Sequence, residues 1–444
     1  MNSASRWIKF ILPSLLGVGL FLTPLTYDGK QTIVIGLIAD GVRESLGSWL
    51  ALIVTLTFAC SALLSSYVSL VKPAWLKRQQ LIESVFSTTP VWLVLRILGG
   101  VLCTMTYLQW GPEWVIGADT GQIAYVEIAG IIFCIMACAN LLLPYLTEFG
   151  FLEFVGTLIT RPFQWLFRLP GRAGLDALTS WVGDSSIGTI LTIRQYESGH
   201  YSAREAAVVV TNFSAVSLPF AVVIAQMAKI DHMFVPFYLT VALCGIAAAM
   251  VTPRFPPLAN ISKGFFQRDS RADEIAANGR SILGQATEAA LSRAAHGPNF
   301  KQIFNQGSRS IFDIYFAVLP AAMTIEFIVL VIYHHSSILQ WLSLPMVPVL
   351  QLLQIPEAEM AAAGTLIGFF DQFIPVIIST TIDSPVTRFV LAGLSITQLL
   401  YLAENGLLIL RSSIPLNVKQ LAAIFLIRTI IVLPILTLAA NLLM

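Results

Sequence analysis

Charged residues are scarce in this chain. They make up 11% of its 444 residues, while hydrophobic residues make up 56%; a soluble domain carries roughly 25% charged residues. The mean hydropathy is +0.77. This composition excludes an ordinary soluble domain and predicts a polytopic membrane protein. The formal net charge of +1 also gives no reason to expect a nucleic-acid partner.

Cysteine is scarce too, and its spacing argues against two kinds of structural site. The five cysteines lie inside apolar runs and form no Cys-x-x-Cys pair; they are Cys60, Cys103, Cys134, Cys138 and Cys244. The sequence therefore predicts neither a disulfide framework nor a zinc site. Free cysteine in such surroundings packs as a small hydrophobe.

Motifs of catalysis are missing as well. The sequence contains no P-loop, no Gly-x-Ser-x-Gly elbow and no His-Glu-x-x-His zinc motif. His334 and His335 are adjacent at the expected end of a helix, and that is poor geometry for a shared metal. We therefore expect no enzyme, no metal and no cofactor.

Long apolar runs dominate the chain instead. A spanning helix needs about 20 apolar residues, and the runs that meet this length are 8–26, 47–71, 90–109, 123–146, 204–228, 233–252, 311–333, 384–410 and 419–441. Basic residues cluster after alternate runs, which predicts a cytoplasmic N-terminus and a periplasmic C-terminus. We expect the first run to be a retained helix rather than a cleaved signal peptide, because no small-residue cleavage site follows it.

Two broken apolar segments interrupt this pattern. The first, 171–195, contains Gly183-Asp-Ser-Ser-Ile-Gly188, and the second, 357–382, contains Phe370-Asp-Gln-Phe-Ile-Pro375. The predicted topology has them enter from opposite sides of the membrane. We therefore expect two inverted re-entrant helical hairpins. Paired Gly- or Pro-interrupted segments of this kind are typical of the central binding site of a transporter.

These features predict an all-α polytopic membrane protein with inverted repeats, each a hairpin followed by a long transmembrane helix. A short amphipathic interfacial helix is expected at 33–46. In the linker, Ile275, Ile282, Leu283 and Ala286 lie at near-helical spacing, so helix content is expected there. The predicted parts are N-terminal transmembrane helices (1–150), a first repeat unit (151–253), a cytoplasmic amphipathic linker (254–310) and a second repeat unit (311–444).

Candidate binding residues lie at the two hairpin tips and in the helix after each hairpin. Free backbone N–H groups at a tip favour anionic or carbonyl oxygen, and polar residues at membrane depth are functional hypotheses. The alternative for each is a polar turn or an interhelical hydrogen bond. Arg388 and Arg428 are expected to snorkel or to form ion pairs near span ends. The candidates for substrate or ion binding are Gly183, Asp184, Ser185, Ser186, Asn212, Ser214, Asp371, Gln372, Glu404 and Asn405.

Several stretches resemble a known family. Residues 171–188 and 196–214, with Pro236-Phe-Tyr-Leu-Thr240 and Pro253-Arg-Phe-Pro-Pro257, are similar to YjiH-type bacterial inner-membrane proteins over nearly the whole chain. That family carries a gate (nucleoside-recognition) module, which is also similar to parts of concentrative nucleoside transporters. The resemblance implies an inverted-repeat fold in which the two repeat units are gate units. It also implies the inner membrane as location and a smaller gate-family subunit as partner, with a homo-oligomer as the alternative.

Two functions fit these observations. The first is a secondary transporter that moves a small polar or anionic solute through the lipid bilayer by alternating access of two gate units, with sodium or a proton as coupling cation. The alternative is a non-transporting membrane scaffold or an obligate subunit of a two-component gate-family complex. A passive channel is a third reading, which predicts flux without saturation.

The substitution Asp184→Asn separates the first two functions. If the protein is a transporter, we expect the variant to assemble normally while solute uptake falls, because only a ligand-binding carboxylate is lost. Uptake into liposomes and size-exclusion chromatography of the complex would measure the two properties. Loss of assembly with no solute-specific effect would favour the scaffold.

Overall fold

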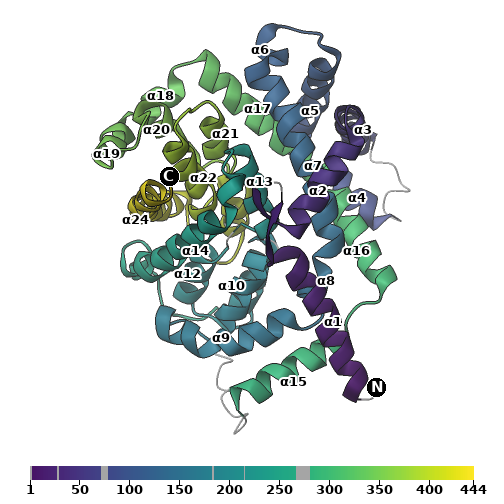
Figure 1. Cartoon of the computed structure of the whole chain (residues 1–444), viewed down its shortest axis with the longest axis vertical. Helices are drawn as coiled ribbons and strands as arrows, with labels where there is room; N and C mark the ends of the chain where they lie inside the picture. The colour runs from purple at the N-terminus through teal and green to yellow at the C-terminus, as the bar shows by residue number, and fades with distance from the viewer. Residues whose placement is uncertain (1–2, 28–29, 72–78, 183–184, 215, 267–280) are drawn as a thin grey trace. The chain divides into compact units, whose positions relative to one another are not determined.

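The structure is a computed structural model that describes residues 3–444 except 28–29, 72–78, 183–184, 215 and 267–280. Regular structure in this part is almost entirely helical; β1 (Pro24–Tyr27) and β2 (Lys30–Ile33) form a short antiparallel hairpin. The predicted all-α polytopic membrane class is thus confirmed (Figure 1). Six described helical stretches are long and apolar enough to span a membrane: Trp49–Val71, Pro90–Leu108, Glu113–Thr147, Asp231–Arg254, Phe300–His335 and Val418–Leu443.

The chain divides into two compact units, each assembled from separate segments. The larger unit comprises Met1–Ile33, Leu143–Pro298 and Leu342–Met444, and the smaller unit comprises Val34–Leu142 and Asn299–Trp341. The division into an N-terminal region, two gate units and a cytoplasmic linker stays a prediction.

The smaller unit is a bundle in which α3 packs on α5, α5 on α17, and α2 on α7. Its first helix, α2, occupies the segment predicted to be a short amphipathic helix. π-Helical turns at Ala118–Ile128 and Ile314–Val318 lead into α7 and α17. The helices are α2 (Val34–Leu46), α3 (Trp49–Val71), α4 (Gln80–Phe86), α5 (Pro90–Leu108), α6 (Glu113–Ile116), α7 (Ala129–Leu142), α16 (Phe300–Asp313) and α17 (Leu319–His335).

A buried arginine ties the helices of the smaller unit together. Arg96 is 6% exposed. Its Nε donates to the carbonyl of Ala317 at 3.0 Å, and its Nη1 donates to the carbonyl of Val85 at 2.7 Å and to Ser65 Oγ at 3.1 Å. Asp313 supplies a carboxylate that acts on this guanidinium electrostatically. The buried cation therefore has both neutral acceptors and an acidic neighbour.

The larger unit contains helix pairs at the positions predicted for the hairpins. α10 packs on α11, and α20 packs on α21; their re-entry into the membrane stays a prediction. α18 (Ile338–Ser343) leads the chain back into this unit. The helices are α1 (Ser3–Phe21), α8 (Pro144–Thr147), α9 (Phe151–Phe167), α10 (Arg172–Val182), α11 (Ser185–Glu197), α12 (Ala203–Asn212), α13 (Leu218–Met227), α14 (Phe234–Val251), α15 (Ile282–Ala295), α19 (Val347–Leu352), α20 (Ala358–Ile367), α21 (Ile374–Thr380), α22 (Pro385–Thr397), α23 (Leu407–Arg411) and α24 (Val418–Leu443).

Two runs predicted as continuous spans are interrupted, so that prediction was wrong for 204–228 and 384–410. The first run breaks between α12 and α13, and the second breaks between α22 and the π-helical turn Leu402–Gly406 that precedes α23. Pro219 in the first turn of α13 has no N–H and restricts the residue before it. Leu399 has a left-handed φ of 63°, which ends α22. Apolar composition alone does not reveal these breaks, because their residues are mostly hydrophobic.

The helix in the predicted linker, α15, packs on α9 and α1 through alanines. Ala286, Ala290 and Ala294 are fully buried at i, i+4 spacing. Of the linker residues noted at helical spacing, Ala286 lies on this face, Leu283 is 59% exposed, and Ile275 lies outside the described residues. Alanine suits this contact because its small side chain allows the backbone of α15 to approach α9 and α1 closely.

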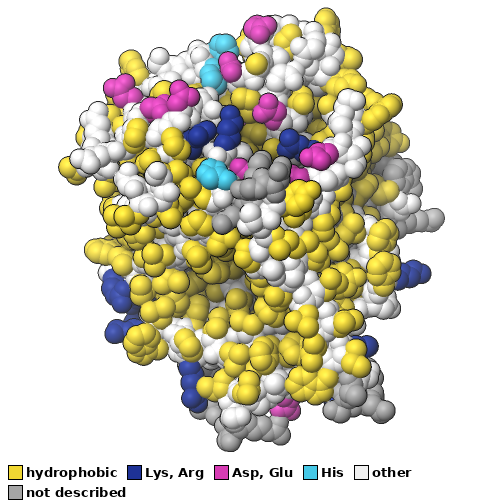
Figure 2. Space-filling view, viewed as in Figure 1, with side chains coloured by type: hydrophobic (Ala, Val, Ile, Leu, Met, Phe, Trp, Pro, Cys, Tyr) yellow, Lys and Arg dark blue, Asp and Glu magenta, His cyan; other side chains and the backbone are white. Residues whose placement is uncertain are grey.

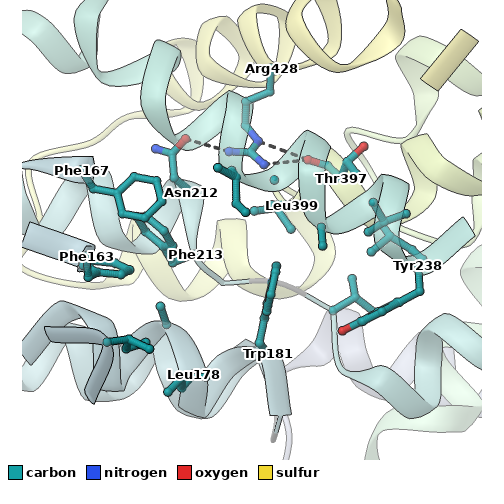
Figure 3. A pocket seen from close by; sticks show the side chains of 18 residues that line it. Phe163, Phe167, Leu178, Trp181, Asn212, Phe213, Tyr238, Thr397, Leu399 and Arg428 are labelled. Carbon is teal, nitrogen blue, oxygen red and sulfur yellow. Dashed lines mark hydrogen bonds between the residues drawn. The ribbon is translucent and has the colours of Figure 1, made fainter. Parts of the chain in front are cut away.

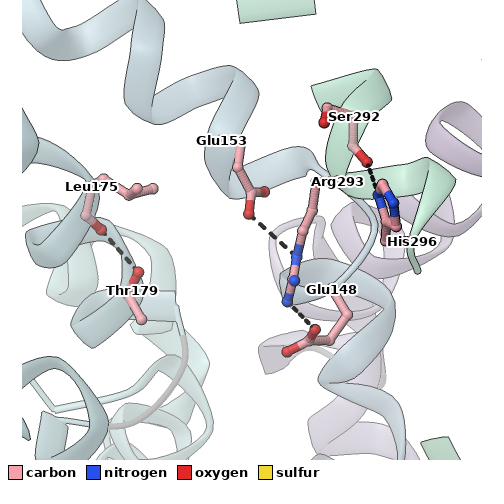
Figure 4. A network of polar contacts seen from close by, with 7 residues as sticks. All are labelled: Glu148, Glu153, Leu175, Thr179, Ser292, Arg293 and His296. Carbon is pink, nitrogen blue, oxygen red and sulfur yellow. Dashed lines mark hydrogen bonds and ion pairs between the residues drawn. The ribbon is translucent and has the colours of Figure 1, made fainter. Parts of the chain in front are cut away.

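Polar contacts hold α15 at the end where it meets α9 (Figure 4). Arg293 Nη2 donates to Glu148 Oε2, and Arg293 Nε lies 3.4 Å from Glu153 Oε1. Gly150, between these two glutamates, has a left-handed φ of 98°. A Cβ at Gly150 would lie 2.4 Å from the carbonyl oxygen of Ala290 and 2.9 Å from its Cα. Only glycine accommodates both constraints.

The molecular surface is largely apolar. Hydrophobic side chains cover most of the face seen in Figure 2, and charged side chains on it are few. Leu63 and Leu70 on α3 are 71% and 80% exposed. Soluble monomers rarely expose apolar patches beyond a few hundred Å², so a surface of this kind fits contact with lipid.

We predict that Gly150→Ala destabilises the larger unit. The new Cβ would clash with backbone atoms of Ala290 and would hold alanine at positive φ, a strain of about 1–3 kcal/mol. Thermal unfolding of the purified protein in detergent should show a lower midpoint. Gly19→Ala is the matched control, because nothing lies within 4 Å of a Cβ built there. Equal midpoints for both variants would contradict the prediction.

Candidate functional site

A fully buried arginine lies at the centre of the larger unit. Arg428 is on α24 and is 0% exposed. Its Nη1 donates to Asn212 Oδ1 at 2.7 Å, and its Nη2 and Nε donate to the carbonyl of Thr397 at 2.7 and 3.3 Å. The expectation that Arg428 snorkels or forms an ion pair near a span end was wrong. It is the eleventh residue of the 26-residue helix Val418–Leu443, so its side chain cannot reach an aqueous boundary as a terminal one can.

Both partners of Arg428 are the last residues of broken helices. Asn212 ends α12, and Thr397 ends α22. The last carbonyls of a helix have no intrahelical donor, and this end of a helix carries partial negative charge. The guanidinium therefore stabilises two helix ends where the sequence interrupts both helices.

The charge of Arg428 has no carboxylate partner among the described residues. A guanidinium has five N–H donors. Three of them have acceptors here, and each terminal nitrogen donates once. One N–H on each terminal nitrogen is left without an acceptor in the described part of the chain. Such a pair of N–H groups matches the two oxygens of a carboxylate.

A cavity of about 220 Å³ adjoins this arginine. Its walls come from α9, α10, α14 and the ends of α12 and α22, and they are mostly aromatic or aliphatic (Figure 3). Phe163, Phe167 and Phe213 form a triangle of rings, with centroids 4.7 Å apart for the first two and 4.9 Å from Phe213 to each. The labelled lining residues in Figure 3 are Phe163, Phe167, Leu178, Trp181, Asn212, Phe213, Tyr238, Thr397, Leu399 and Arg428.

Two predicted site residues meet in a second polar cluster. Ser214 Oγ lies 2.9 Å from Thr189 Oγ1 on α11, and Thr189 Oγ1 donates to Asn405 Oδ1 at 3.4 Å. All three side chains are buried. Asn405 Nδ2 has no hydrogen-bond partner among the described residues. Thr189 in the first hairpin is thereby connected to Ser214 in the break after α12 and to Asn405 in the π-helical turn after α22.

The second hairpin places its predicted residues differently. Asp371 and Gln372 are 4% and 3% exposed at the tip between α20 and α21. Asp371 Oδ1 accepts from the N–H of Phe373 at 2.8 Å, so the carboxylate caps its own turn. The carbonyl of Gln372 accepts from Ser395 Oγ. In the described part of the chain, neither side chain forms a hydrogen bond with Arg428.

A buried glutamine near this tip was not predicted as a site residue. Gln398 Nε2 donates to the carbonyl of Thr365 at 2.8 Å and to Thr429 Oγ1 at 3.0 Å. Its Oε1 has no donor among the described residues. A Cβ on Gly368 would lie 2.4 Å from that oxygen, so glycine is needed for this close approach.

The remaining predicted residues cannot be placed in the site. Gly183 and Asp184 lie outside the described residues. Ser185 and Ser186 begin α11, and Glu404 belongs to the π-helical turn 402–406, but their side chains are likewise outside the description.

The first hairpin instead contains a buried carboxylate that sequence reasoning passed over. Asp176 is 2% exposed. Its Oδ2 accepts from Tyr201 Oη at 2.7 Å and from Thr192 Oγ1 at 3.4 Å. The described residues hold no group of three or more His, Cys, Asp or Glu side chains that could bind a metal ion.

Comparison with known proteins places the chain in a family. The family model Gate, described as nucleoside recognition, matches residues 129–231. The uncharacterized protein BpOF4_10220 of Alkalihalophilus pseudofirmus is 38% identical over 435 residues, which cover 98% of this chain and 94% of that protein. The chain therefore belongs to the same family as that protein and contains a Gate domain. No solved structure matches it with significance.

The Gate domain contains one side of the site. Asn212, Ser214, Thr189 and Asp176 all lie within 129–231, whereas Arg428 lies far beyond it. The Gate match and the apolar helices together indicate a transporter-like, multi-pass membrane protein. Arg428 could have been found from the sequence as a charged residue near the middle of an apolar helix.

We predict that Arg428 and Asn212 are energetically coupled. Arg428→Leu should lower stability by about 1–3 kcal/mol, because it leaves the Thr397 carbonyl and the Asn212 amide oxygen without a donor. The double variant with Asn212→Ala should lose less than the sum of the single losses. Unfolding midpoints of the four proteins of this double-mutant cycle measure the coupling. Strict additivity would refute a direct interaction.

Proposed function

We propose that this protein is a secondary transporter of a small anionic solute across the bacterial inner membrane. The observation that carries the proposal is the fully buried Arg428, which holds two broken helices beside a cavity and has no carboxylate partner among the described residues. A buried cation is costly unless an anion or polar groups compensate it. An anionic solute would supply that compensation.

In this proposal the broken helices provide the movement. Asn212 and Thr397 end α12 and α22, and a break in a helix lets its two halves move against each other. Binding of an anion at Arg428 would alter how tightly these two helix ends are held. Alternating access would then follow from movement of the two gate units, with hairpins at 171–195 and 357–382 as the gates.

We place the coupling cation at the cluster of Thr189, Ser214 and Asn405. Its neutral side-chain oxygens lie within hydrogen-bond distance of one another next to the helix breaks, and transporters of this general kind bind sodium at such breaks. A cation is needed for uptake because moving one negative charge inward costs about 2.3 kcal/mol per 100 mV of interior-negative potential. A proton is the alternative ion.

Other features of the proposal come from the sequence. The distribution of basic residues would put the N-terminus in the cytoplasm and the C-terminus in the periplasm. By the family resemblance, a smaller gate-family subunit, or a second copy of this chain, would be the partner in the membrane. Asp184, Asp371, Gln372 and Glu404 stay candidate ligands of the solute or the ion.

Solute uptake by reconstituted protein tests the proposal. Proteoliposomes are given radiolabelled organic anions, nucleosides, amino acids or short peptides, each with and without a sodium or proton gradient. Uptake is measured rather than current, because symport of one anion with one cation moves no net charge. We expect saturable uptake of organic anions, and we expect Arg428→Gln to lose it while Arg411→Gln, which removes an exposed charge, keeps it. A folded protein that takes up no solute would support the scaffold instead.

A further inference from the structure

We propose that the cavity at Arg428 takes a small organic monocarboxylate with an apolar, ring-sized body. This inference rests on the proposed function and specifies its substrate class. It is argued from three properties of the cavity: the charge at one end, the small number of other polar groups, and the composition and size of the walls.

The charge and geometry of Arg428 favour a carboxylate. One N–H on each terminal nitrogen has no acceptor in the described part of the chain, and two such donors bind the two oxygens of a carboxylate in parallel. A single buried positive charge is balanced by one negative charge. A dianion would bring a second charge into an apolar cavity, where an unpaired charge is strongly disfavoured.

Two other polar side chains of the walls are already used. Asn212 Nδ2 donates to the carbonyl of Val208 at 3.1 Å and to Thr211 Oγ1 at 3.0 Å, and its Oδ1 accepts from Arg428. Thr397 Oγ1 donates to the carbonyl of Gly393 at 2.8 Å. The Tyr238 hydroxyl and the Trp181 indole N–H also line the cavity, but a ligand with several hydroxyl, amide or ammonium groups would still bury most of them without partners, which costs free energy for each group. This argues against sugars, nucleosides and zwitterionic amino acids.

The walls fit an apolar body of limited size. Aromatic side chains surround the cavity, among them Phe163, Phe213, Trp181 and Tyr238 (Figure 3). Aromatic walls bind rings and flat apolar groups by burial and by edge or offset contacts. The volume of about 220 Å³ lies below the range of about 300–1,000 Å³ that drug-sized ligands occupy. The body is therefore close to one ring.

Calorimetric binding to the purified full-length protein in nanodiscs tests this inference, with benzoate as probe. We expect benzoate to bind saturably, and benzamide, its neutral isostere, to bind at least about tenfold more weakly. Acetate should also bind more weakly, because it lacks the ring. Phenylalanine and phenylphosphonate, with an added ammonium or a second charge, should bind more weakly still. Tighter binding of benzamide, phenylphosphonate or uridine than of benzoate would overturn the substrate class.

Substitutions identify the site. Arg428→Gln should weaken benzoate binding about tenfold or more, whereas Arg411→Gln should leave it unchanged. Phe213→Ala should weaken benzoate binding but leave acetate binding unchanged, because it removes wall and no charge. Unchanged benzoate affinity in both Arg428→Gln and Phe213→Ala would place the probe elsewhere and overturn the inference.

A second variant keeps the test decisive if Arg428→Gln does not fold. Asn212→Asp puts a carboxylate where an oxygen already lies 2.7 Å from Arg428 Nη1, so it supplies the missing negative charge from within the protein. It also removes the hydrogen bond from Asn212 Nδ2 to the carbonyl of Val208, so the unfolding transition serves only to check that the variant folds, and we expect benzoate binding to be lost. A folded Asn212→Asp variant that binds benzoate with unchanged affinity would contradict the inference.

The outcomes separate this inference from the proposed function. Benzoate binding at Arg428 without uptake of any solute into proteoliposomes would support the site and refute the transporter. Transport of another class of solute with no benzoate binding would refute the monocarboxylate and leave the transporter standing. Binding of laurate in place of benzoate would assign the cavity to an acyl chain of the membrane and overturn the inference.

Discussion

The contact on which the larger unit depends is the one between a buried guanidinium and the ends of two broken helices. A helix that stops inside an apolar core leaves carbonyl groups without donors, and such groups are costly away from water. Arg428 donates to the last carbonyl of α22, that of Thr397, and to the side-chain amide oxygen of Asn212, the last residue of α12. In return, the partial negative charge of the two helix ends compensates part of its own charge. The same contacts therefore lower the free-energy cost of interrupting the helices and the free-energy cost of burying the arginine.

The two buried arginines of this protein show how the same residue takes two roles. Arg96 has the carboxylate of Asp313 as an electrostatic neighbour and donates to side-chain and carbonyl oxygens of the helices packed around it. The positive charge of Arg96 therefore has a carboxylate neighbour within the protein. Arg428 has only neutral acceptors in the described part of the chain, and it adjoins a cavity. The difference between a structural and a ligand-binding arginine lies in the groups that other segments bring to it.

Prediction from the sequence was most successful where the composition or periodicity of a single segment determines its structure. The low content of charge, the apolar runs and the short amphipathic helix at 34–46 follow from composition and periodicity, which act locally. It was less successful at the helix breaks after Asn212 and Thr397, because a few polar residues such as Ser214 and Gln398 also occur in continuous apolar helices, and packing decides where each helix ends. The contact face of α15 consists of three alanines, of which the helical spacing of apolar residues singled out only Ala286.

The sequence by itself determined that this is a helical membrane protein with paired interruptions, and it marked Asn212, Ser214 and Asn405 as polar residues within apolar surroundings. Only the tertiary structure decided which of them meet. Asn212 and Arg428 are 216 residues apart, as are Thr189 and Asn405, and no periodicity relates residues so distant. Their contacts depend on how several helices pack, and that packing also encloses the cavity.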